Sequence, residues 1–282
     1  MERCEYRFME IKPVVKWVGG KRQLLPQLLQ RMPENYGTYC EPFIGGGALL
    51  FAVQPKRAII NDYNAELVNL YTVIKNDCEA LISDLRKHKN EADYYYEMRA
   101  LDRDFEKWQS LSDVERASRF VFLNKTCFNG LYRVNSQGFV NTPFGRYKNP
   151  TICPEDDLRG ISEYFTKSKV KILCGDYRKA VKKLKSGDFV YFDPPYDPIS
   201  PTASYTGYTE NGFTKQNQIE LAETCKALDE KGVFFMLSNS ATDFIKEQYQ
   251  GFNIDIVKAK RAINCKGDGR APVEEVIVRN YG

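Results

Sequence analysis

The sequence predicts an α/β fold in which a mostly parallel sheet is interrupted by a mainly helical insertion. Short apolar runs alternate with helical patterns near both ends of the chain, as in parallel strands joined by helices. This alternation gives way to charged helices between residues 65 and 165. Residues 189–192 (Phe-Val-Tyr-Phe) are apolar throughout and are followed closely by two prolines, which is typical of a central strand buried on both faces. We therefore expect residues 1–64 and 166–282 to form one domain and residues 65–165 another.

The composition is that of an ordinary globular protein with a mild positive charge. Hydrophobic residues make up 43% and charged residues 28% of the 282 residues. Lys and Arg outnumber Asp and Glu by 41 to 37, so the net charge of +4 permits a polyanionic partner without demanding one. Most of the 18 Tyr and 17 Phe are expected in the core.

Cysteine and histidine usage argues against a metal centre. The 8 cysteines are scattered without a Cys-x-x-Cys pair, which favours free thiols in a reducing compartment. His88 is the single histidine, and its place after Arg86 and Lys87 predicts a solvated surface residue. No apolar run approaches the roughly 18 residues of a membrane span, and Met1 to Glu5 do not resemble a secretory signal. We expect a cytoplasmic protein without a metal.

Two glycine-rich turns lie in the first fifty residues. Gly19, Gly20 and Lys21 precede leucines at helical spacing, where a charged ligand group could bind, although plain turn chemistry is the alternative. A short strand then runs into three glycines at 45–47, which let the backbone approach a ligand closely. Leu50 stands where a strict dinucleotide fingerprint has its third glycine, so this turn alone is a moderate signal.

The next strand, at residues 58–62, ends in an acid and is followed by a helix at 64–74. An acid about twenty residues beyond a glycine turn commonly binds ribose hydroxyls. Asp62 is therefore a candidate cofactor ligand, and a helix cap is its alternative role.

Within the insertion, the sequence predicts helices at residues 79–89, 91–107 and 113–125. Residues 124–148 follow, and their Asn-Gly and Ser-Gln-Gly turns predict a hairpin-like loop region. Arg, Asn, Tyr, Phe and Lys are interleaved there, and such side chains hydrogen-bond to base edges and stack on bases. Their density favours a nucleic-acid interface over ordinary surface polarity.

After the insertion, strands and helices alternate again. A strand at 170–174 ends in Gly175-Asp176-Tyr177 and precedes a basic helix reaching Lys185. The apolar strand at 189–192 then ends at Asp193, and the long polar loop from Asp197 to Phe213 suggests a mobile lid. The remaining predicted elements are a helix from Thr214 to Lys231, a strand at 232–239, a further helix, and strands at 252–257 and 273–278.

The strand ends together carry two kinds of ligand chemistry. The glycine turn, Asp62 and the Asp176-Tyr177 pair suit an adenosine-type cofactor. The segment Asp193-Pro194-Pro195-Tyr196 offers a carboxylate, backbone carbonyls and an aromatic face, which suit a flat ring bearing an NH2 group. A nucleoside cofactor beside such a pocket suggests methyl transfer to an exocyclic amine.

These motifs resemble a known family. Phe43-x-Gly45-x-Gly47 with Asp193-Pro-Pro-Tyr196 is similar to the amino-methyltransferases that use S-adenosylmethionine. The motif order, with Lys16-Trp17-x-Gly19-Gly20-Lys21 first and the helical insertion third, resembles the alpha-group Dam family of DNA adenine-N6 methyltransferases, including restriction-associated enzymes that modify GATC. Asn129 to Arg133 and Pro143 to Tyr147 add to this resemblance, which covers nearly the whole chain. It implies a Rossmann-like S-adenosylmethionine-dependent methyltransferase sheet and, at 65–165, a helical target-recognition domain.

The resemblance also implies roles for individual residues. S-adenosylmethionine would contact Trp17, Lys21, Phe43, Gly45, Gly47, Asp62, Asp176, Tyr177 and Asp193. Asp193, Pro194, Pro195 and Tyr196 would bind the flipped adenine for catalysis. Double-stranded DNA would contact Lys16, Phe128, Asn129, Leu131, Arg133, Pro143 and Tyr147. Phe128 stands where a Dam relative uses a tyrosine wedge, so this chain keeps the ring without the hydroxyl. A cognate restriction endonuclease is an implied functional partner.

Two rival functions differ from this reading. A methyltransferase of another amine, such as RNA adenine, cytosine N4 or protein glutamine, would share the scaffold. Asp rather than Asn at position 193 disfavours the glutamine enzymes, and the loops bearing Arg133 favour duplex DNA. A non-catalytic nucleic-acid-binding relative would not need Asp62, Asp193 and Tyr196, which are all present.

Overall fold

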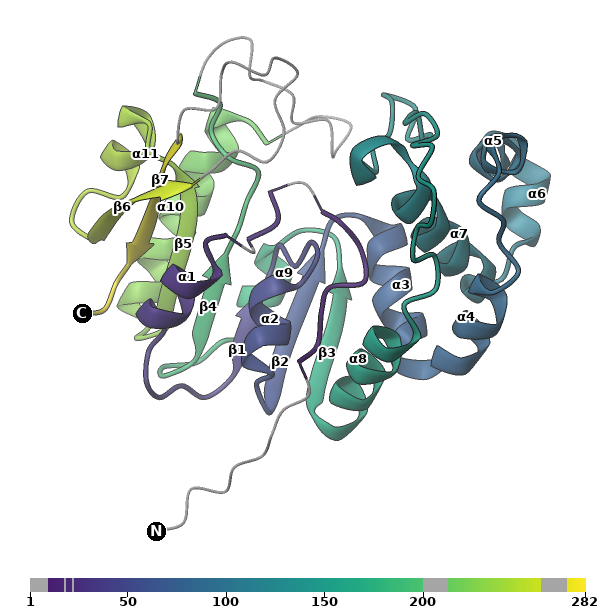
Figure 1. Cartoon of the computed structure of the whole chain (residues 1–282). Helices are drawn as coiled ribbons and strands as arrows, with labels where there is room; N and C mark the ends of the chain where they lie inside the picture. The colour runs from purple at the N-terminus through teal and green to yellow at the C-terminus, as the bar shows by residue number, and fades with distance from the viewer. Residues whose placement is uncertain (1–9, 18, 22, 200–212, 260–272) are drawn as a thin grey trace.

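The computed structural model describes residues 10–17, 19–21, 23–199, 213–259 and 273–282. Its centre is a seven-stranded sheet in the order β3-β2-β1-β4-β5-β7-β6 (Figure 1). The first five strands are parallel, and β7 runs antiparallel to both β5 and β6. The strands are β1 (Tyr39–Glu41), β2 (Arg57–Asp62), β3 (Lys169–Cys174), β4 (Phe189–Phe192), β5 (Phe234–Ser240), β6 (Asn253–Ala259) and β7 (Val273–Arg279). The predicted α/β class is thus confirmed.

Strand β4 lies in the middle of the sheet and is buried on both faces. All four of its side chains are buried, as expected for an apolar run between parallel neighbours. Phe189 and Tyr191 belong to one apolar core, whereas Val190 and Phe192 belong to a second core. This alternation follows from the two-residue period of a strand, and it holds the end of β4 firmly between two packed layers.

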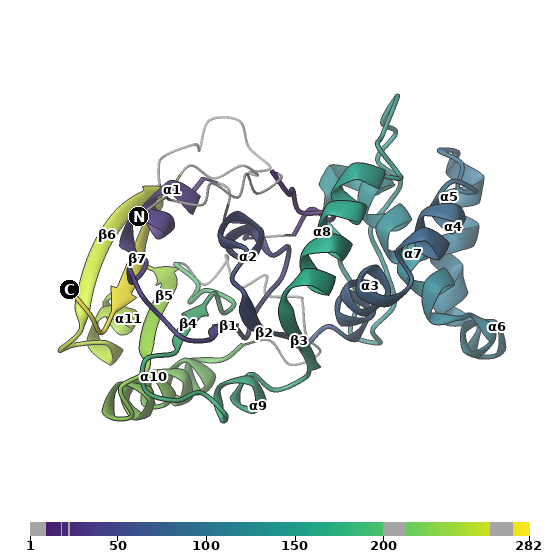
Figure 2. The same ribbon diagram turned by 90° about the horizontal axis from the view of Figure 1, so that it is seen from below.

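Helices cover both faces of the sheet (Figure 2). Helices α1 (Leu25–Arg31), α2 (Ala48–Val53) and α8 (Glu155–Lys167) lie on one face. Helices α9 (Arg178–Val181), α10 (Lys215–Glu230) and α11 (Asp243–Gln248) lie on the other. Helix α3 (Ala65–Asn76) leaves the end of β2 and packs against both β3 and the helices of the insertion. None of the helices among the described residues is long and apolar enough to cross a membrane.

The insertion is helical, as predicted, and lies beyond the β3 edge of the sheet (Figure 1). It contains α4 (Cys78–Leu85), α5 (Ala92–Ala100), η1 (Leu101–Arg103), α6 (Phe105–Ser110), α7 (Asp113–Thr126) and η2 (Phe128–Gly130). Helix α7 begins with a capping box between Ser112 and Glu115 and buries Phe120, Val121, Phe122 and Leu123. These residues belong to the same apolar core as one face of the sheet, so the insertion has no core of its own. The domain boundaries at 65 and 165 stay a prediction.

Three helices differ from the predicted extents. The helix predicted at 79–89 is α4, which ends at Leu85. The predicted helix at 91–107 is divided into α5, η1 and α6, because the Asp104 carboxylate accepts the Lys107 amide and starts a new helix. The basic helix expected to reach Lys185 ends at Val181, since the chain tightens into turns before β4. The hairpin-like region at 124–148 is confirmed by antiparallel bridges between Cys127 and Phe144 and between Val134 and Val140.

The prediction that His88 is a solvated surface residue is wrong. Its ring stacks on Phe122 with centroids 4.4 Å apart, and its two nitrogens hydrogen-bond to Tyr94 and Ser118 at 2.8 and 2.9 Å. Burial lowers the pKa of His88 to about 4. The neighbouring Arg86 and Lys87 are exposed, so these charged side chains lie on the solvent side of the turn while His88 points inward.

This environment predicts a pH dependence of stability. The folded-state pKa of His88 lies below its ordinary value of 6.5, so protonation favours the unfolded chain. Stability from the neutral imidazole is full above pH 6.5 and declines as the pH falls toward 4, by at most about 3 kcal/mol. NMR titration of this single histidine measures its pKa directly, and the unfolding free energy of His88→Gln should depend less on pH between 7 and 5. An imidazole pKa near 6.5 would contradict the prediction.

Candidate active site

The candidate site lies at the carboxyl ends of β1 and β4, where the strand order reverses direction. Strand β1 pairs with β2 on one side and with β4 on the other. Chains that leave β1 and β4 therefore diverge, and ligands of open α/β sheets bind in the crevice formed there. The glycine turn follows β1, and Asp193 follows β4. The two predicted ligand groups are thus on neighbouring strands.

The glycine turn is fixed to the end of β2 by Asp62. One carboxylate oxygen of Asp62 accepts the Gly45 amide at 3.0 Å, and the other accepts the Asn64 amide at 2.9 Å. Asn64 caps helix α3 by accepting the Leu67 amide, so the helix-cap alternative for Asp62 is wrong. Burial raises the pKa of Asp62, while the backbone hydrogen bonds oppose that rise. The carboxylate keeps further lone pairs for a hydroxyl ligand.

Trp17 packs directly against this turn. Gly45 has φ +46°, and a Cβ there would lie 2.7 Å from Cδ1 of Trp17. A side chain at position 45 would therefore be both strained and in collision with the indole. The Tyr71 hydroxyl donates to the Gly45 carbonyl at 2.7 Å, and Gly47 has φ +72°. The N-terminal segment and the glycine turn thus form one packed unit beside the end of β1.

An aromatic pair lies on the other side of the glycine turn. The rings of Phe43 and Tyr177 stack with centroids 5.3 Å apart, which is too close to admit a third ring between them. Tyr177 is buried, and its hydroxyl lies 3.4 Å from Thr224 Oγ1. The Asp176 carboxylate pairs with Arg178, which lowers the pKa of the acid. This group borders the ends of β1 and β3.

Asp193 is the centre of the second group. Its Oδ1 lies 2.7 Å from Nζ of Lys21 and 3.2 Å from the Ser238 hydroxyl, which donates to it. Burial raises the pKa of Asp193, and Lys21 opposes that rise. The Lys21 ammonium also lies 4.5 Å from the centroid of the Tyr196 ring. Lys21 thus stands between the carboxylate and the aromatic ring that were predicted to hold a target base.

Glu41 is a third titratable group here, and the sequence analysis assigned it no role. It directly follows Cys40 at the end of β1 and is 3% exposed. Burial raises the pKa of Glu41 to about 8, against the hydrogen bond that Tyr39 donates at 2.6 Å, and Asp193 adds to the rise. An acid at the carboxyl end of a central strand is a signal that could have identified it. Glu275 on β7, which accepts the Tyr196 hydroxyl at 2.9 Å, had no such signal.

The loop after Asp193 is held by a buried polar network. Gln218 on α10 donates to the Pro195 carbonyl at 2.8 Å and accepts from Asn239 at 3.0 Å. The Asn239 side-chain oxygen accepts the Asp197 amide at 2.9 Å. Gln218 and Asn239 are 1% and 0% exposed. The bonds to the Pro195 carbonyl and from the Asp197 amide restrain the backbone on either side of Tyr196. Residues 200–212 of the predicted lid lie outside the described residues.

The predicted DNA-contacting residues lie together on the loops beyond α7. The Phe128 amide donates to the Pro143 carbonyl at 2.8 Å, so the two loop strands are adjacent. The Lys16 ammonium lies 5.4 Å from the Tyr147 ring centroid, which brings the N-terminal segment to the same loops. Arg133 is exposed, and its Nε donates to Asn141 Oδ1 at 3.0 Å. Phe128 is 52% exposed, Asn129 and Pro143 are exposed, and Leu131 is half-buried.

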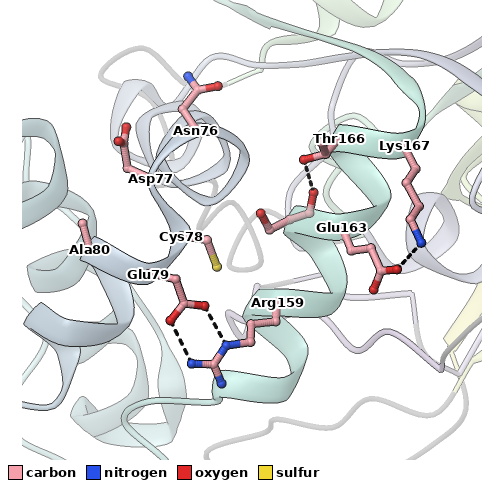
Figure 3. A pocket seen from close by; sticks show the side chains of 10 residues that line it. Asn76, Asp77, Cys78, Glu79, Ala80, Arg159, Glu163, Thr166 and Lys167 are labelled. Carbon is pink, nitrogen blue, oxygen red and sulfur yellow. Dashed lines mark hydrogen bonds and ion pairs between the residues drawn. The ribbon is translucent and has the colours of Figure 1, made fainter.

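One surface hollow lies away from these residues. It measures about 640 Å³ and lies between the start of α4 and the helix α8 (Figure 3). Figure 3 shows Glu79 turned toward Arg159, with which it forms hydrogen bonds of 2.7 and 2.9 Å, and Glu163 paired with Lys167. None of the predicted site residues lines it. Among the described residues, no group of three or more His, Cys, Asp or Glu could hold a metal ion.

The strand order, the glycine turn after β1, the acid that ends β2 and the Asp-Pro-Pro-Tyr segment after β4 define the class of Rossmann-like amino-methyltransferases. The family described as D12 class N6 adenine-specific DNA methyltransferase matches residues 17–263, and the chain belongs to it. The protein is therefore an adenine-specific DNA methyltransferase.

Three relatives illustrate the similarity. The chain is 48% identical over 276 residues to the Type II methyltransferase M1.LlaDCHI of Lactococcus lactis subsp. cremoris, with 97% of each chain covered. It is 44% identical to the Type II methyltransferase M.MjaIII of Methanocaldococcus jannaschii, covering 97% of this chain and 100% of that one. It is 34% identical to the DNA adenine methylase of Escherichia coli (strain K12), with 93% of each chain covered.

The polar network behind Pro195 generates a prediction. Gln218→Leu removes the donor to the Pro195 carbonyl and leaves Asn239 without its acceptor, which should cost about 1–3 kcal/mol of stability. Displacement of the Asp193 loop should also lower kcat for DNA methylation by about tenfold or more, since small misplacements of catalytic groups are costly. Cys225→Ala is the matched control, because it alters another buried side chain of α10 without touching Pro195. Equal kcat in Gln218→Leu and the control would refute the positioning role.

Proposed function

We propose that this methyltransferase transfers the methyl group of S-adenosylmethionine to N6 of an adenine flipped out of duplex DNA, within the sequence GATC. The observation that carries the proposal is the partly buried Asp193 carboxylate, which shares Lys21 as a neighbour with the Tyr196 ring at the carboxyl end of β4. A carboxylate and an aromatic face in one site suit an adenine, because its amine donates hydrogen bonds and its ring stacks. The membership of the adenine-specific family agrees with that chemistry.

The residues around the glycine turn fit S-adenosylmethionine. Asp62 has carboxylate lone pairs available for ribose hydroxyls beside the Gly45 amide. Gly45 and Gly47 leave the backbone bare where a ligand must approach, and the Phe43–Tyr177 pair offers an apolar wall for a base. Trp17, Lys21 and Asp176 border the same crevice from the N-terminal segment and β3. When bound, the cofactor supplies an electrophilic methyl group on a sulfonium.

Asp193 and the following backbone activate the amine. The adenine amine is a poor nucleophile, because its lone pair is delocalised into the ring. We assign the acceptors of its two N–H groups to the Asp193 carboxylate and the Pro194 carbonyl, which together localise that lone pair on nitrogen. Fixed acceptors in a buried site need little reorganisation, so positioning and electrostatics supply much of the rate. The Gln218–Asn239 network keeps the Pro195–Asp197 backbone in place while this happens.

Entry of the base requires Lys21 to move. Its ammonium now lies 2.7 Å from Asp193 and 4.5 Å from the Tyr196 centroid, which is where the amine and ring of the base would bind. Flipping costs a few kcal/mol of lost pairing and stacking, and stacking on Tyr196 offsets part of this cost. The exposed Phe128 would insert into the DNA duplex next to the flipped base, and Asn129 lies beside Phe128. A released Lys21 could then contact the cofactor.

Sequence choice is assigned to the loops beyond α7 and to Lys16. The family resemblance assigns this reading to Lys16, Leu131, Arg133, Pro143 and Tyr147. The contact between Lys16 on the N-terminal segment and Tyr147 on the loops supports the assignment. The GATC assignment rests on this resemblance. Digestion of methylated plasmid with GATC-specific nucleases of different methylation sensitivity tests it. Two relatives carry the name Type II methyltransferase, which supports a cognate restriction endonuclease as partner.

Removal of the central carboxylate should abolish the reaction. Asp193→Ala deletes the acceptor of the target amine and should eliminate methyl transfer, while overall DNA affinity stays largely intact because phosphate contacts dominate it. A radiolabelled methyl-transfer assay and a DNA-binding titration measure the two properties separately. Near-normal turnover by the variant would overturn the assignment of Asp193.

Loss of one recognition side chain should relax specificity. Arg133 is exposed and held by Asn141, so its guanidinium is available for a base edge. Arg133→Ala should cost about 1–3 kcal/mol of discrimination at one base pair. Rates on duplexes with single-base changes in the site provide the measurement. Unchanged discrimination at every position would show that Arg133 does not read a base.

A further inference from the structure

The backbone of Lys16 is held by a buried side chain from the insertion. The Lys16 amide donates to Asn124 Oδ1 at 2.8 Å, and Asn124 Nδ2 donates to the Lys16 carbonyl at 2.8 Å. The two residues are 108 positions apart in sequence. Asn124 is 0% exposed near the end of α7, whereas the side chain of Lys16 is exposed. One amide group thus satisfies both backbone groups of a residue whose ammonium faces outward.

This arrangement needs asparagine rather than a residue that only fills space. An amide offers one acceptor and a donor together, whereas Asp has no donor at neutral pH and Leu has neither. A buried amide is costly unless it is paired, so an apolar side chain would suffice if packing were the only requirement. The Asn124 amide pairs with the Lys16 backbone as a neighbouring strand would. This pairing fixes the position of the Lys16 side chain along the loops.

The loop itself holds the other side of Lys16. Gly130 has φ +66°, and a Cβ at that position would lie 2.4 Å from Cδ and 3.2 Å from Cβ of Lys16. The Lys16 ammonium lies over the Tyr147 ring, 5.4 Å from the ring centroid. The aliphatic part of Lys16 therefore passes closely over bare backbone between Asn129 and Leu131. Asn124 thus hydrogen-bonds to the backbone of Lys16, Gly130 leaves space for its side chain, and Tyr147 contacts its ammonium.

We propose that Asn124 is a specificity-positioning residue, which fixes Lys16 against the recognition loops so that its ammonium reads one base pair of the DNA site. This inference rests on the proposed function, which assigns Lys16 to the DNA. Asn124 acts through Lys16 and touches no DNA itself, because it is buried. Its loss should therefore change the choice of sequence rather than the chemistry at Asp193.

The test compares Asn124→Leu, Asn124→Asp, Lys16→Ala and the double variant Lys16→Ala/Asn124→Leu. The kcat/KM of each is measured on the preferred duplex and on duplexes with single-base changes, and thermal unfolding shows that each is folded. Asn124→Leu should lose discrimination by roughly fivefold or more at the base pair that Lys16→Ala affects. In the double variant it should add nothing to Lys16→Ala, as expected for residues acting as a unit. Asn124→Asp should not rescue, since its carboxylate faces the Lys16 carbonyl.

Ser118→Ala is the matched control. Ser118 is a buried polar residue of the same helix, and it hydrogen-bonds to His88 instead of the N-terminal segment. It should lose some stability without any change in discrimination. A folded Asn124→Leu with unchanged discrimination overturns the inference. If Lys16→Ala itself leaves discrimination unchanged, the assignment of Lys16 to the DNA fails instead, so the two failures are distinguishable.

If the Asn124 variants do not fold, a second pair of variants tests whether the position of Lys16 sets sequence discrimination. Gly130→Ala and Gly138→Ala both place a side chain at positive φ, +66° and +81°, in the same loop region. Only Gly130→Ala pushes on Lys16, because a Cβ at Gly138 meets nothing within 4 Å. Gly130→Ala should alter discrimination at the Lys16 base pair, and Gly138→Ala should not. Equal discrimination in these two variants would overturn the inference.

Discussion

The structure depends on the partly buried carboxylate of Asp193, which is held at the end of the central strand. Strand β4 is buried between two apolar cores, and the prolines after Asp193 prevent it from continuing. Asp193 is therefore placed by the packing of the whole sheet rather than by a flexible loop. A carboxylate that loses much of its hydration is costly without partners, and Lys21 and Ser238 supply them for Asp193. The N-terminal segment must approach the sheet closely for Lys21 to reach it.

The electrostatics of this cluster favour an amine ligand. Burial and the nearby Asp193 raise the pKa of Glu41, and Lys21 contacts both the Asp193 carboxylate and the Tyr196 ring. A ligand that displaces Lys21 must itself donate hydrogen bonds to Asp193, or it leaves a carboxylate buried and unpaired. An exocyclic NH2 satisfies this condition, whereas a carbonyl at the same position would face the carboxylate. Stacking on Tyr196 adds the requirement for a flat ring.

Much of the fold and part of the site could be predicted because their signals are local. Apolar runs, glycine turns and the Asp-Pro-Pro-Tyr segment are each contained within a few residues, and they placed the ligand groups at the ends of β1, β2 and β4. The partners that hold these groups were not predictable in this way. Gln218 meets Pro195 from 23 residues away, Glu275 meets Tyr196 from 79, and Asn124 meets Lys16 from 108. Such pairs depend on how helices pack, which no local pattern states.

His88 shows that a local pattern can also mislead. Its charged neighbours predicted exposure, but its ring packs inward on Phe122. The division of the chain at residues 65 and 165 is also not a division of the core, since α7 shares one apolar cluster with the sheet. A helical change in sequence pattern marks an insertion, but it does not show whether that insertion packs on its own.

The shared core gives the N-terminal segment its importance. Lys16 lies against the loops beyond α7, and Lys21 lies against Asp193, so the six residues from Lys16 to Lys21 connect the two regions. Fully extended, such a segment spans at most about 18 Å. Asn124 holds its first residue, and Trp17 packs on the glycine turn beside it. DNA contacts at Lys16 and displacement of Lys21 by a base would therefore act on one short stretch of chain. Because the insertion and the sheet share one apolar core around this stretch, a shift of the chain at Lys16 lies only a few residues from the lysine that holds the Asp193 carboxylate.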